Sequence, residues 1–202
     1  MLTSIIMGGK LILPHGIIPN QELVISNGKI TKMQTKNKDS LKMKKSASQR
    51  IMENEYTIID ATNLYIAPGF IDLHVHGGYG WDTSMGTTTA LQKIALYHAQ
   101  GGTTSLLPTL MATPPLLTER FLQSVSRLTG KKTGGATILG AHLEGPYLNP
   151  LKAGAQNPAF LHHPDVKEMQ RFISLAKDSL KNRYLGSRIT WKQRAHGLIK
   201  TP

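Results

Sequence analysis

Short apolar runs separated by turn residues fill the first 66 positions, a pattern typical of strands. The clearest signal is a hairpin, in which Asn27-Gly28 separates a run over 22–26 from a run over 29–33. An Asn-Gly pair favours this because it adopts the positive φ angles of a type I′ turn. Further strands are predicted at 2–6, 10–13, 56–59 and 64–66, with Gly8-Gly9 breaking the first pair. Residues 1–66 are therefore predicted to form a small β domain.

Between these strands, residues 35–49 are rich in Lys and Ser and show no apolar period. Such a composition cannot bury a face, and it predicts a mobile loop.

Beyond residue 66 the pattern alternates between strands and helices. Strands are predicted at 70–76, 104–107 and 137–144, and helices at 88–100, 116–128 and 164–180. This alternation is typical of parallel βαβ units, so residues 67–180 are predicted to be an α/β domain. Three such units do not close a (β/α)8 barrel, which takes eight units and about 250 residues. The domain is either an open layered sheet or the first part of a barrel.

Residues 181–202 form a basic tail in which the pattern fails. The place calls for a fourth buried strand, yet the segment has six Lys/Arg, no acid and no apolar run of strand length. We interpret this tail as an aberrant segment translated out of frame, because natural solvated segments usually mix both signs of charge. A genuine basic tail is the alternative.

The formal net charge of +12 raises the alternative of a nucleic-acid binder. The segment 29–50 holds eight Lys/Arg and one acid, however, and together with the tail it leaves 10 basic and 11 acidic residues in the rest of the chain. The body is thus close to neutral, and aromatic residues do not interleave the cations. We therefore expect no nucleic-acid partner.

The chain has no cysteine, which excludes disulfides and thiolate metal sites and fits a cytoplasmic location. No apolar run reaches the length of about 18 residues that a membrane span needs, so no membrane association is expected.

The strongest chemical signal lies at the end of the predicted strand 70–76. Alternate side chains of a strand share a face, so Asp72, His74 and His76 are expected on one side, and Ile71, Leu73 and Val75 against the covering helices. Imidazole is the commonest metal ligand, and a spacing of two lets His74 and His76 converge on one ion. The pair runs directly into Gly77-Gly78, which argues against a chance surface pair.

A carboxylate lies at the end of another predicted strand, as the two histidines do. Glu144 ends the predicted strand 137–144 and precedes Gly145-Pro146, and it completes a His/His/Glu set of nitrogen and oxygen ligands. His142 shares its face one layer deeper, where we expect a supporting role rather than ligation. His98 is interpreted as a helix-surface residue and Tyr147 as a residue at the mouth of the pocket.

Three motifs together resemble one family. They are His-Val-His-Gly-Gly-x-Gly-x-Asp (74–82), Gly-Gly-Thr-Thr-Ser-x-Leu-Pro-Thr (101–109) and His-Leu-Glu-Gly-Pro-Tyr-Leu-Asn-Pro-x-Lys-x-Gly-Ala (142–155). The first, with Pro-Gly-Phe-Ile-Asp before it, is similar to the first-strand signature of the amidohydrolase superfamily. In this order the three resemble the N-acetylglucosamine-6-phosphate deacetylase family, in register over roughly 1–180.

The resemblance implies the first three βα units of a (β/α)8 TIM barrel, preceded by part of a β-sandwich domain. It implies deacetylation of N-acetylglucosamine 6-phosphate to glucosamine 6-phosphate and acetate, with one or two divalent cations, zinc, iron or similar, as cofactor. His74, His76 and Glu144 then match metal ligands. Gly154, Ala155 and Gln156 match the segment that contacts the sugar, although many relatives have His in place of Gln156.

The resemblance also implies a general base, an Asp, beyond residue 180, so no catalytic residue is assigned and negligible activity is expected of this chain alone. Full-length relatives are expected to be homo-oligomers. Two alternatives stay open. One is another amidohydrolase acting on a cyclic amide or an aminopurine, and the other is a non-catalytic basic fragment that binds nucleic acid.

Overall fold

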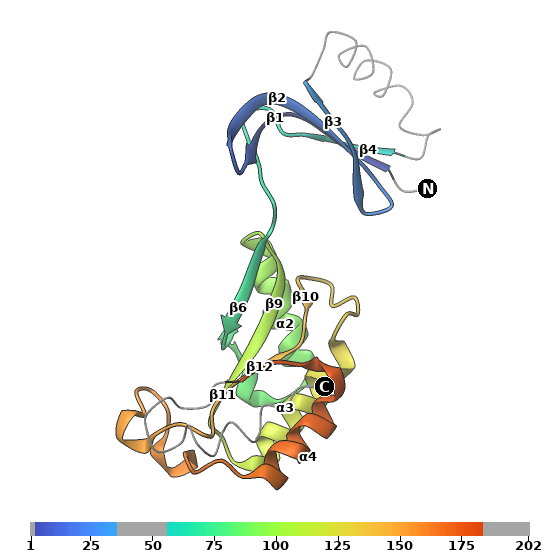
Figure 1. Cartoon of the computed structure of the whole chain (residues 1–202). Coiled ribbons are helices and arrows are strands. Elements are labelled where there is room, and N and C mark those ends of the chain that lie inside the picture. The colour runs from blue at the N-terminus through green and yellow to red at the C-terminus, as the bar shows by residue number, and fades with distance from the viewer. Residues whose placement is uncertain (1–2, 36–55, 184–202) are drawn as a thin grey trace. The chain divides into compact units, whose positions relative to one another are not determined.

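The structure, a computed structural model, describes residues 3–35 and 56–183, and the chain divides into two compact units, Met1–Pro68 and Gly69–Pro202 (Figure 1). Most of the predicted mobile loop, from residue 36, and the tail from residue 184 lie outside the described residues.

The first unit is a five-stranded mixed sheet. Its order is β3-β2-β1-β4, with β5 also paired to β1. Neighbours are antiparallel in β1–β2 and β2–β3, and parallel in β1–β4 and β1–β5. The bounds are β1 Thr3–Leu13, β2 Gly16–Ser26, β3 Lys29–Thr35, β4 Tyr56–Asp60 and β5 Tyr65–Ile66.

The hairpin prediction is confirmed: β2 and β3 are joined by Asn27 and Gly28, with φ of 52° and 75°. The predicted break at Gly8-Gly9 is wrong, since β1 runs through both residues. The ladder instead shifts register on either side of Gly9, and Gly8 has φ of 80°. Glycine accommodates such a bulge without ending the strand.

The second unit contains a parallel sheet of order β10-β9-β11-β12, with β6 also paired to β9. The main strands are β6 Phe70–Val75, β9 Thr103–Met111, β10 Thr137–Ile138, β11 Ala141–Glu144 and β12 Leu180–Arg183. A small hairpin, β7 Gly77–Gly78 and β8 Trp81–Asp82, follows β6 directly. The 3-10 turns are η1 Thr83–Met85, η2 Pro150–Lys152, η3 Pro158–Phe160 and η4 Lys177–Ser179.

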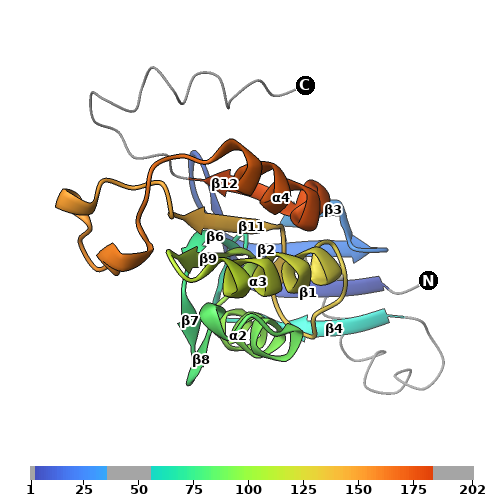
Figure 2. The ribbon, with the colours of Figure 1, turned by 90° about the horizontal axis from the view of Figure 1, so that it is seen from below.

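Three helices accompany this sheet: α2 Thr88–Gln100, α3 Pro115–Leu128 and α4 Val166–Ala176. Figures 1 and 2 show them together along the strands. A buried apolar cluster fills the space between helices and sheet, and its largest members include Leu91, Leu110, Phe121, Leu122 and Phe172. Strand and helix alternate as predicted, which confirms an α/β arrangement for this unit.

Several predicted elements differ at their ends; the strand expected over 104–107, for example, runs from Thr103 to Met111. The strand expected over 137–144 is split into β10 and β11 around Gly140, where a Cβ atom would collide with the carbonyl oxygen of Ser179. The helix expected to reach residue 180 ends at Ala176, because Lys177 takes a φ of 52°. The chain then forms β12, which pairs with β11 at the place where the sequence has no apolar run of strand length.

The apolar face predicted for β6 is only partly buried. Val75 is 7 % exposed, but Ile71 and Leu73 are 62 % and 56 % exposed rather than packed against helices. Among the described residues β6 pairs only with β9, so one edge of this strand is left uncovered.

Within the residues that the structure describes, no helix combines the length and apolar character of a membrane span.

Candidate metal site

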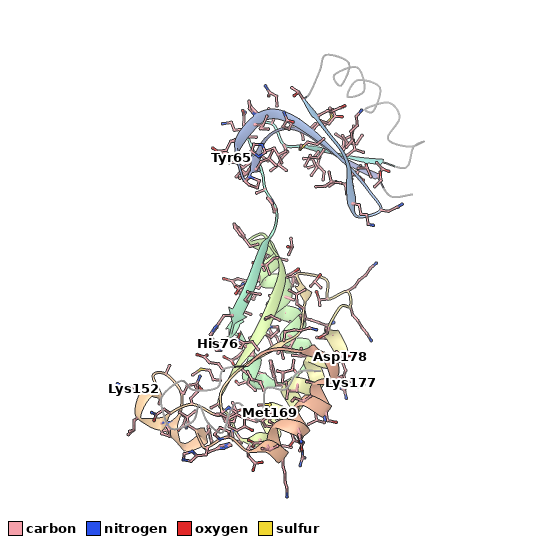
Figure 3. All side chains as sticks on the ribbon, viewed as in Figure 1. Tyr65, His76, Lys152, Met169, Lys177 and Asp178 are labelled. Carbon is pink, nitrogen blue, oxygen red and sulfur yellow. The ribbon has the colours of Figure 1, made fainter. Side chains whose placement is uncertain are left out.

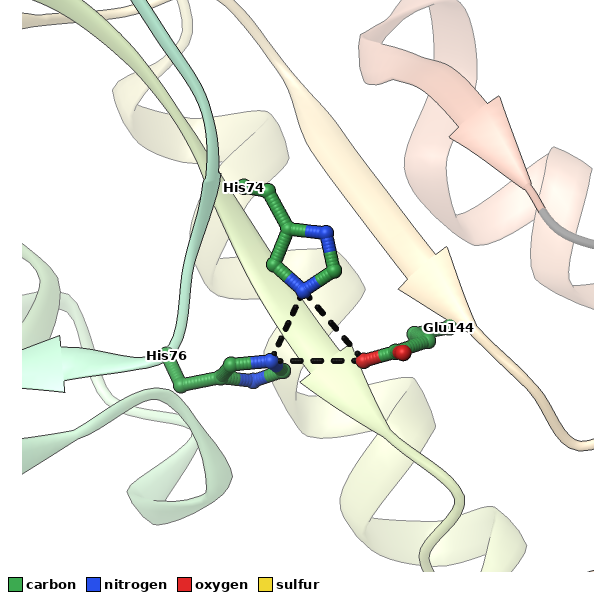
Figure 4. A group of neighbouring side chains, drawn as sticks. All are labelled: His74, His76 and Glu144. Atoms are coloured by element: carbon green, nitrogen blue, oxygen red, sulfur yellow. Dashed lines mark hydrogen bonds and ion pairs between the residues drawn. The ribbon is translucent and has the colours of Figure 1, made fainter. Parts of the chain in front are cut away.

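Three side chains converge at the carboxyl ends of β6 and β11. The Nε2 atoms of His74 and His76 lie 2.9 Å apart. The Oε2 atom of Glu144 lies 3.4 Å from Nε2 of His74 and 3.3 Å from Nε2 of His76 (Figure 4). Figure 3 shows His76 where β6 ends. Residues far apart in sequence meet here because parallel strands carry their carboxyl ends to one edge of a sheet.

The geometry of this triangle fits a metal ion. Ligands at the usual zinc distances of about 2.0–2.1 Å in a tetrahedron are separated from each other by about 3.3 Å. The three atoms of His74, His76 and Glu144, separated by 2.9–3.4 Å, already have this spacing. In the part of the chain that the structure describes, they form the group of His and acidic side chains whose ligand atoms all lie within 4.8 Å.

A second partner orients the imidazole of His76, and another holds the backbone of His74. The Nδ1 atom of His76 lies 3.1 Å from the carbonyl oxygen of Thr109, in β9. A carbonyl can only accept a hydrogen bond, so Nδ1 carries the proton and Nε2 keeps its lone pair for the centre of the triangle. The backbone N–H of His74 donates to Oδ1 of Asp72 at 3.0 Å, which gives Asp72 a structural role.

His142 packs against the ring of His74 from a buried position, one layer deeper than the ligand candidates. It is fully buried, its Nδ1 lies 3.0 Å from the hydroxyl of Thr109, and its ring meets that of His74 edge-on at 4.9 Å. Burial, and then the neighbouring His74, lower the pKa of His142, so the ring is favoured in its neutral form.

The predicted sugar-contacting segment lies in the loop after β11. Gly154 and Ala155 are exposed, but Gln156 is only 6 % exposed, and its Oε1 accepts a hydrogen bond of 2.7 Å from the backbone N–H of Ala112. Ala112 follows β9, so this bond fastens the loop to the same edge of the sheet that carries Glu144. The segment is not part of the His/His/Glu triangle.

His98 has a role that the sequence did not reveal. It is partly buried, and its Nε2 lies 3.0 Å from the carbonyl oxygen of Gly77, the first residue after His76. The helix pattern gave no signal for this contact, because it depends on where the hairpin β7–β8 lies against α2.

The interpretation of Tyr147 as a residue at the pocket mouth is wrong. Its side chain is fully buried, and its hydroxyl donates to Oε2 of Glu168 at 2.8 Å, with the carbonyl oxygen of Asp165 at 3.1 Å. Burial and the acceptor Glu168 raise the pKa of Tyr147. His162 lies 3.4 Å from the same carboxylate oxygen and meets the Tyr147 ring edge-on, so this group ties the loop after β11 to α4.

Comparison with known proteins identifies similar chains. The sequence is 28 % identical over 193 residues to N-acetylglucosamine-6-phosphate deacetylase of Bacillus subtilis, covering 94 % of this chain and 41 % of the relative. It is 26 % identical over 180 residues to N-acetylgalactosamine-6-phosphate deacetylase of Escherichia coli O157:H7, covering 89 % and 43 %. It is 39 % identical over 106 residues, 51 % of this chain, to the N-acetylglucosamine-6-phosphate deacetylase of Danio rerio. No profile of a known protein family matches the sequence.

Solved structures agree on the fold. The N-acetylglucosamine-6-phosphate deacetylase of Pasteurella multocida superposes with a TM-score of 0.78 at 21 % identity, covering 98 % of this chain and 48 % of that one. The enzyme of Mycobacterium smegmatis gives a TM-score of 0.74 at 20 % identity, covering 98 % and 51 %.

The fold and the site thus define the class, an α/β protein with the fold of the solved N-acetylglucosamine-6-phosphate deacetylases and a His/His/Glu group that could hold a metal ion. Within it, the resemblance to N-acetylglucosamine-6-phosphate deacetylases that the three motifs predicted is confirmed by these relatives. The chain spans 43 % and 41 % of the length of the two relatives that it matches over most of its own length.

Proposed function

We propose that this chain is part of a metal-dependent deacetylase that hydrolyses the acetyl amide of N-acetylglucosamine 6-phosphate to glucosamine 6-phosphate and acetate. The parallel units β6-α2, β9-α3 and β11-α4 would be the first three of a (β/α)8 barrel. The sheet of Met1–Pro68 would be part of a β-sandwich domain.

The observation that carries the proposal is the convergence of His74, His76 and Glu144 within 4.8 Å at the carboxyl end of a parallel sheet. Active sites of (β/α)8 enzymes lie at this end of their strands. We assign the three side chains as the residues that would hold a divalent cation, zinc or iron. When bound, such an ion polarises an amide carbonyl and lowers the pKa of a bound water.

The chain's own residues would prepare this chemistry. The Thr109 carbonyl would keep Nε2 of His76 free to bind the ion, and the ring of His142 packs edge-on against that of His74. We place the sugar against Gly154, Ala155 and Gln156, in the loop that Gln156 fastens to Ala112. Because Oε1 of Gln156 is already an acceptor in that bond, the group it offers to substrate is its amide N–H, a neutral donor.

Metal binding is the first test. The purified chain, freed of metal by chelation, is titrated with Zn²⁺ against a chromophoric chelator, and Co²⁺ loading is followed by its visible absorbance. We expect one high-affinity site and a tetrahedral Co²⁺ spectrum. Failure of the chain to compete with the chelator would remove the basis of the proposal.

The substrate is tested on the metal-loaded chain. Binding of N-acetylglucosamine 6-phosphate and N-acetylgalactosamine 6-phosphate is measured by ligand-observed NMR, and acetate release by a coupled assay. We expect binding of the sugar phosphates, and acetate release only when the chain is loaded with metal. Binding of hydantoin or adenine in place of the sugars would favour another amidohydrolase, and retention on heparin at moderate salt would favour the nucleic-acid alternative.

A further inference from the structure

Thr109 lies where three parts of the proposed metal site meet. It is fully buried near the end of β9, the strand between β6 and β11. Its hydroxyl lies 3.1 Å from the backbone N–H of Val75 and 3.0 Å from Nδ1 of His142. Its carbonyl oxygen lies 3.1 Å from Nδ1 of His76. The two oxygens of one residue therefore contact the two residues that follow His74 and the His142 ring that packs against it.

The hydroxyl of Thr109 accepts a backbone hydrogen bond at a point where the pairing of β6 with β9 is irregular. The register of β6 against β9 shifts between Asp72 and Val75, so the ladder is interrupted across His74. The residue opposite Val75 is Pro108. The N–H of Val75 donates to the hydroxyl of Thr109, the next residue along β9, and this side-chain bond fixes the strand between the two histidines.

The carbonyl oxygen is held in its turn. It also accepts a hydrogen bond of 2.7 Å from the hydroxyl of Thr83, which is buried in the turn η1 after the hairpin β7–β8. The carbonyl cannot rotate away from His76 without breaking this second bond. A fixed carbonyl imposes a fixed tautomer and a fixed ring plane on His76.

We propose that Thr109 is a positioning residue, whose hydroxyl holds the end of β6 and the His142 ring so that His74 and His76 are preorganised for metal. This inference rests on the proposed function, since it concerns the same ligand set. The substitution Thr109→Val would keep the side-chain volume and remove every hydroxyl contact. The partners of metal ligands typically contribute about 10–100-fold in metal affinity.

The experiment compares Thr109→Val, Thr109→Ala and Thr109→Ser with the wild-type chain. The control is Thr118→Val, because Thr118 is also buried, at 4 % exposure, and its hydroxyl bonds to Thr113 at 3.0 Å, away from the ligands. Two quantities are measured: Zn²⁺ affinity by competition, and exchange of the Val75 amide hydrogen by NMR in the metal-free protein. The Ala variant repeats the loss of the hydroxyl with a smaller side chain.

We expect Thr109→Val and Thr109→Ala to bind Zn²⁺ about 10–100-fold more weakly. Exchange at Val75 should rise about tenfold while exchange at Leu110 in β9 stays unchanged. Thr109→Ser should restore both quantities to within about threefold of wild type, and Thr118→Val should change neither. A general loss of stability would instead raise exchange throughout β9.

Unchanged Zn²⁺ affinity in Thr109→Val, or unchanged exchange at Val75, would overturn the inference. Absence of Zn²⁺ binding in the wild-type chain would be a different result, because it would refute the proposed metal site. The exchange of the Val75 amide hydrogen, read in the metal-free protein, would then still decide whether Thr109 holds the end of the strand.

Discussion

Nδ1 of His76, the residue directly after β6, lies 3.1 Å from the carbonyl oxygen of Thr109 in the neighbouring parallel strand β9. This contact decides which nitrogen of His76 is protonated. It leaves Nε2 as the atom that meets His74 and Glu144, so the sheet itself sets the geometry of the proposed ligand triangle.

The ligand assignment predicts a large loss of metal affinity when any corner is removed. His74→Ala, His76→Ala and Glu144→Gln should each weaken Zn²⁺ binding by more than about 100-fold, beyond the effect typical of residues that only support ligands. The measurement is competition with a chromophoric chelator. His15→Ala, at an exposed histidine of the other unit, should bind as the wild type does. Equal affinity in all four variants would contradict the assignment.

His98 is predicted to hold the loop that follows His76. His98→Ala removes the bond to the Gly77 carbonyl and should weaken Zn²⁺ binding about tenfold, a supporting effect rather than the loss of a ligand. His98→Gln should retain most of the affinity, because its amide N–H can donate to the same carbonyl. Equal affinity in wild type and His98→Ala would show that the hairpin β7–β8 keeps its position without the hydrogen bond from His98.

Tyr147 predicts a dependence of stability on alkaline pH. Its pKa is raised in the folded protein, whereas the unfolded chain titrates near about 10. Above that pH the folded state binds more protons than the unfolded state, so its stability falls as pH rises. Below that pH, Tyr147→Phe should cost about 1–3 kcal/mol through the lost bond to Glu168.

Urea unfolding of wild type and Tyr147→Phe between pH 8 and 11 measures this contribution. The difference in unfolding free energy between the two proteins should shrink above pH 10. Tyr97→Phe, at a tyrosine that is 43 % exposed, serves as the control and should parallel the wild type at every pH. A constant difference for Tyr147→Phe would contradict the raised pKa.

Helix α3 offers a matched pair for the core. Leu122 is fully buried in the cluster beneath the sheet, whereas Leu116, in the same helix, is 59 % exposed. Leu122→Ala should lower the free energy of unfolding by about 2–5 kcal/mol through lost transfer energy and the cavity. Leu116→Ala should change it by about 0.5 kcal/mol or less. Denaturant unfolding gives both values. Similar losses for the two variants would contradict the difference in burial between Leu122 and Leu116.

Local patterns in the sequence were sufficient for several elements. The helix over 88–100 has the predicted bounds, because Thr87 caps its start and Gly101 follows its end. The hairpin at Asn27-Gly28 follows from the backbone preference of two adjacent residues. The candidate ligands could be selected because each ends an apolar strand, and parallel strands bring such ends together.

The sequence by itself thus determined the alternation of strands and helices, the hairpin and the candidate ligands, since these depend on residues close together in the chain. Only the tertiary structure decided which residues interact. It gave the hydrogen bonds of His76 with Thr109, of His98 with Gly77 and of Tyr147 with Glu168, and the pairing of β12 with β11. The physical reason is that each of these contacts joins positions distant in sequence. The energy of such a contact depends on register and burial, and neither can be read from the periodicity of apolar residues along a single element.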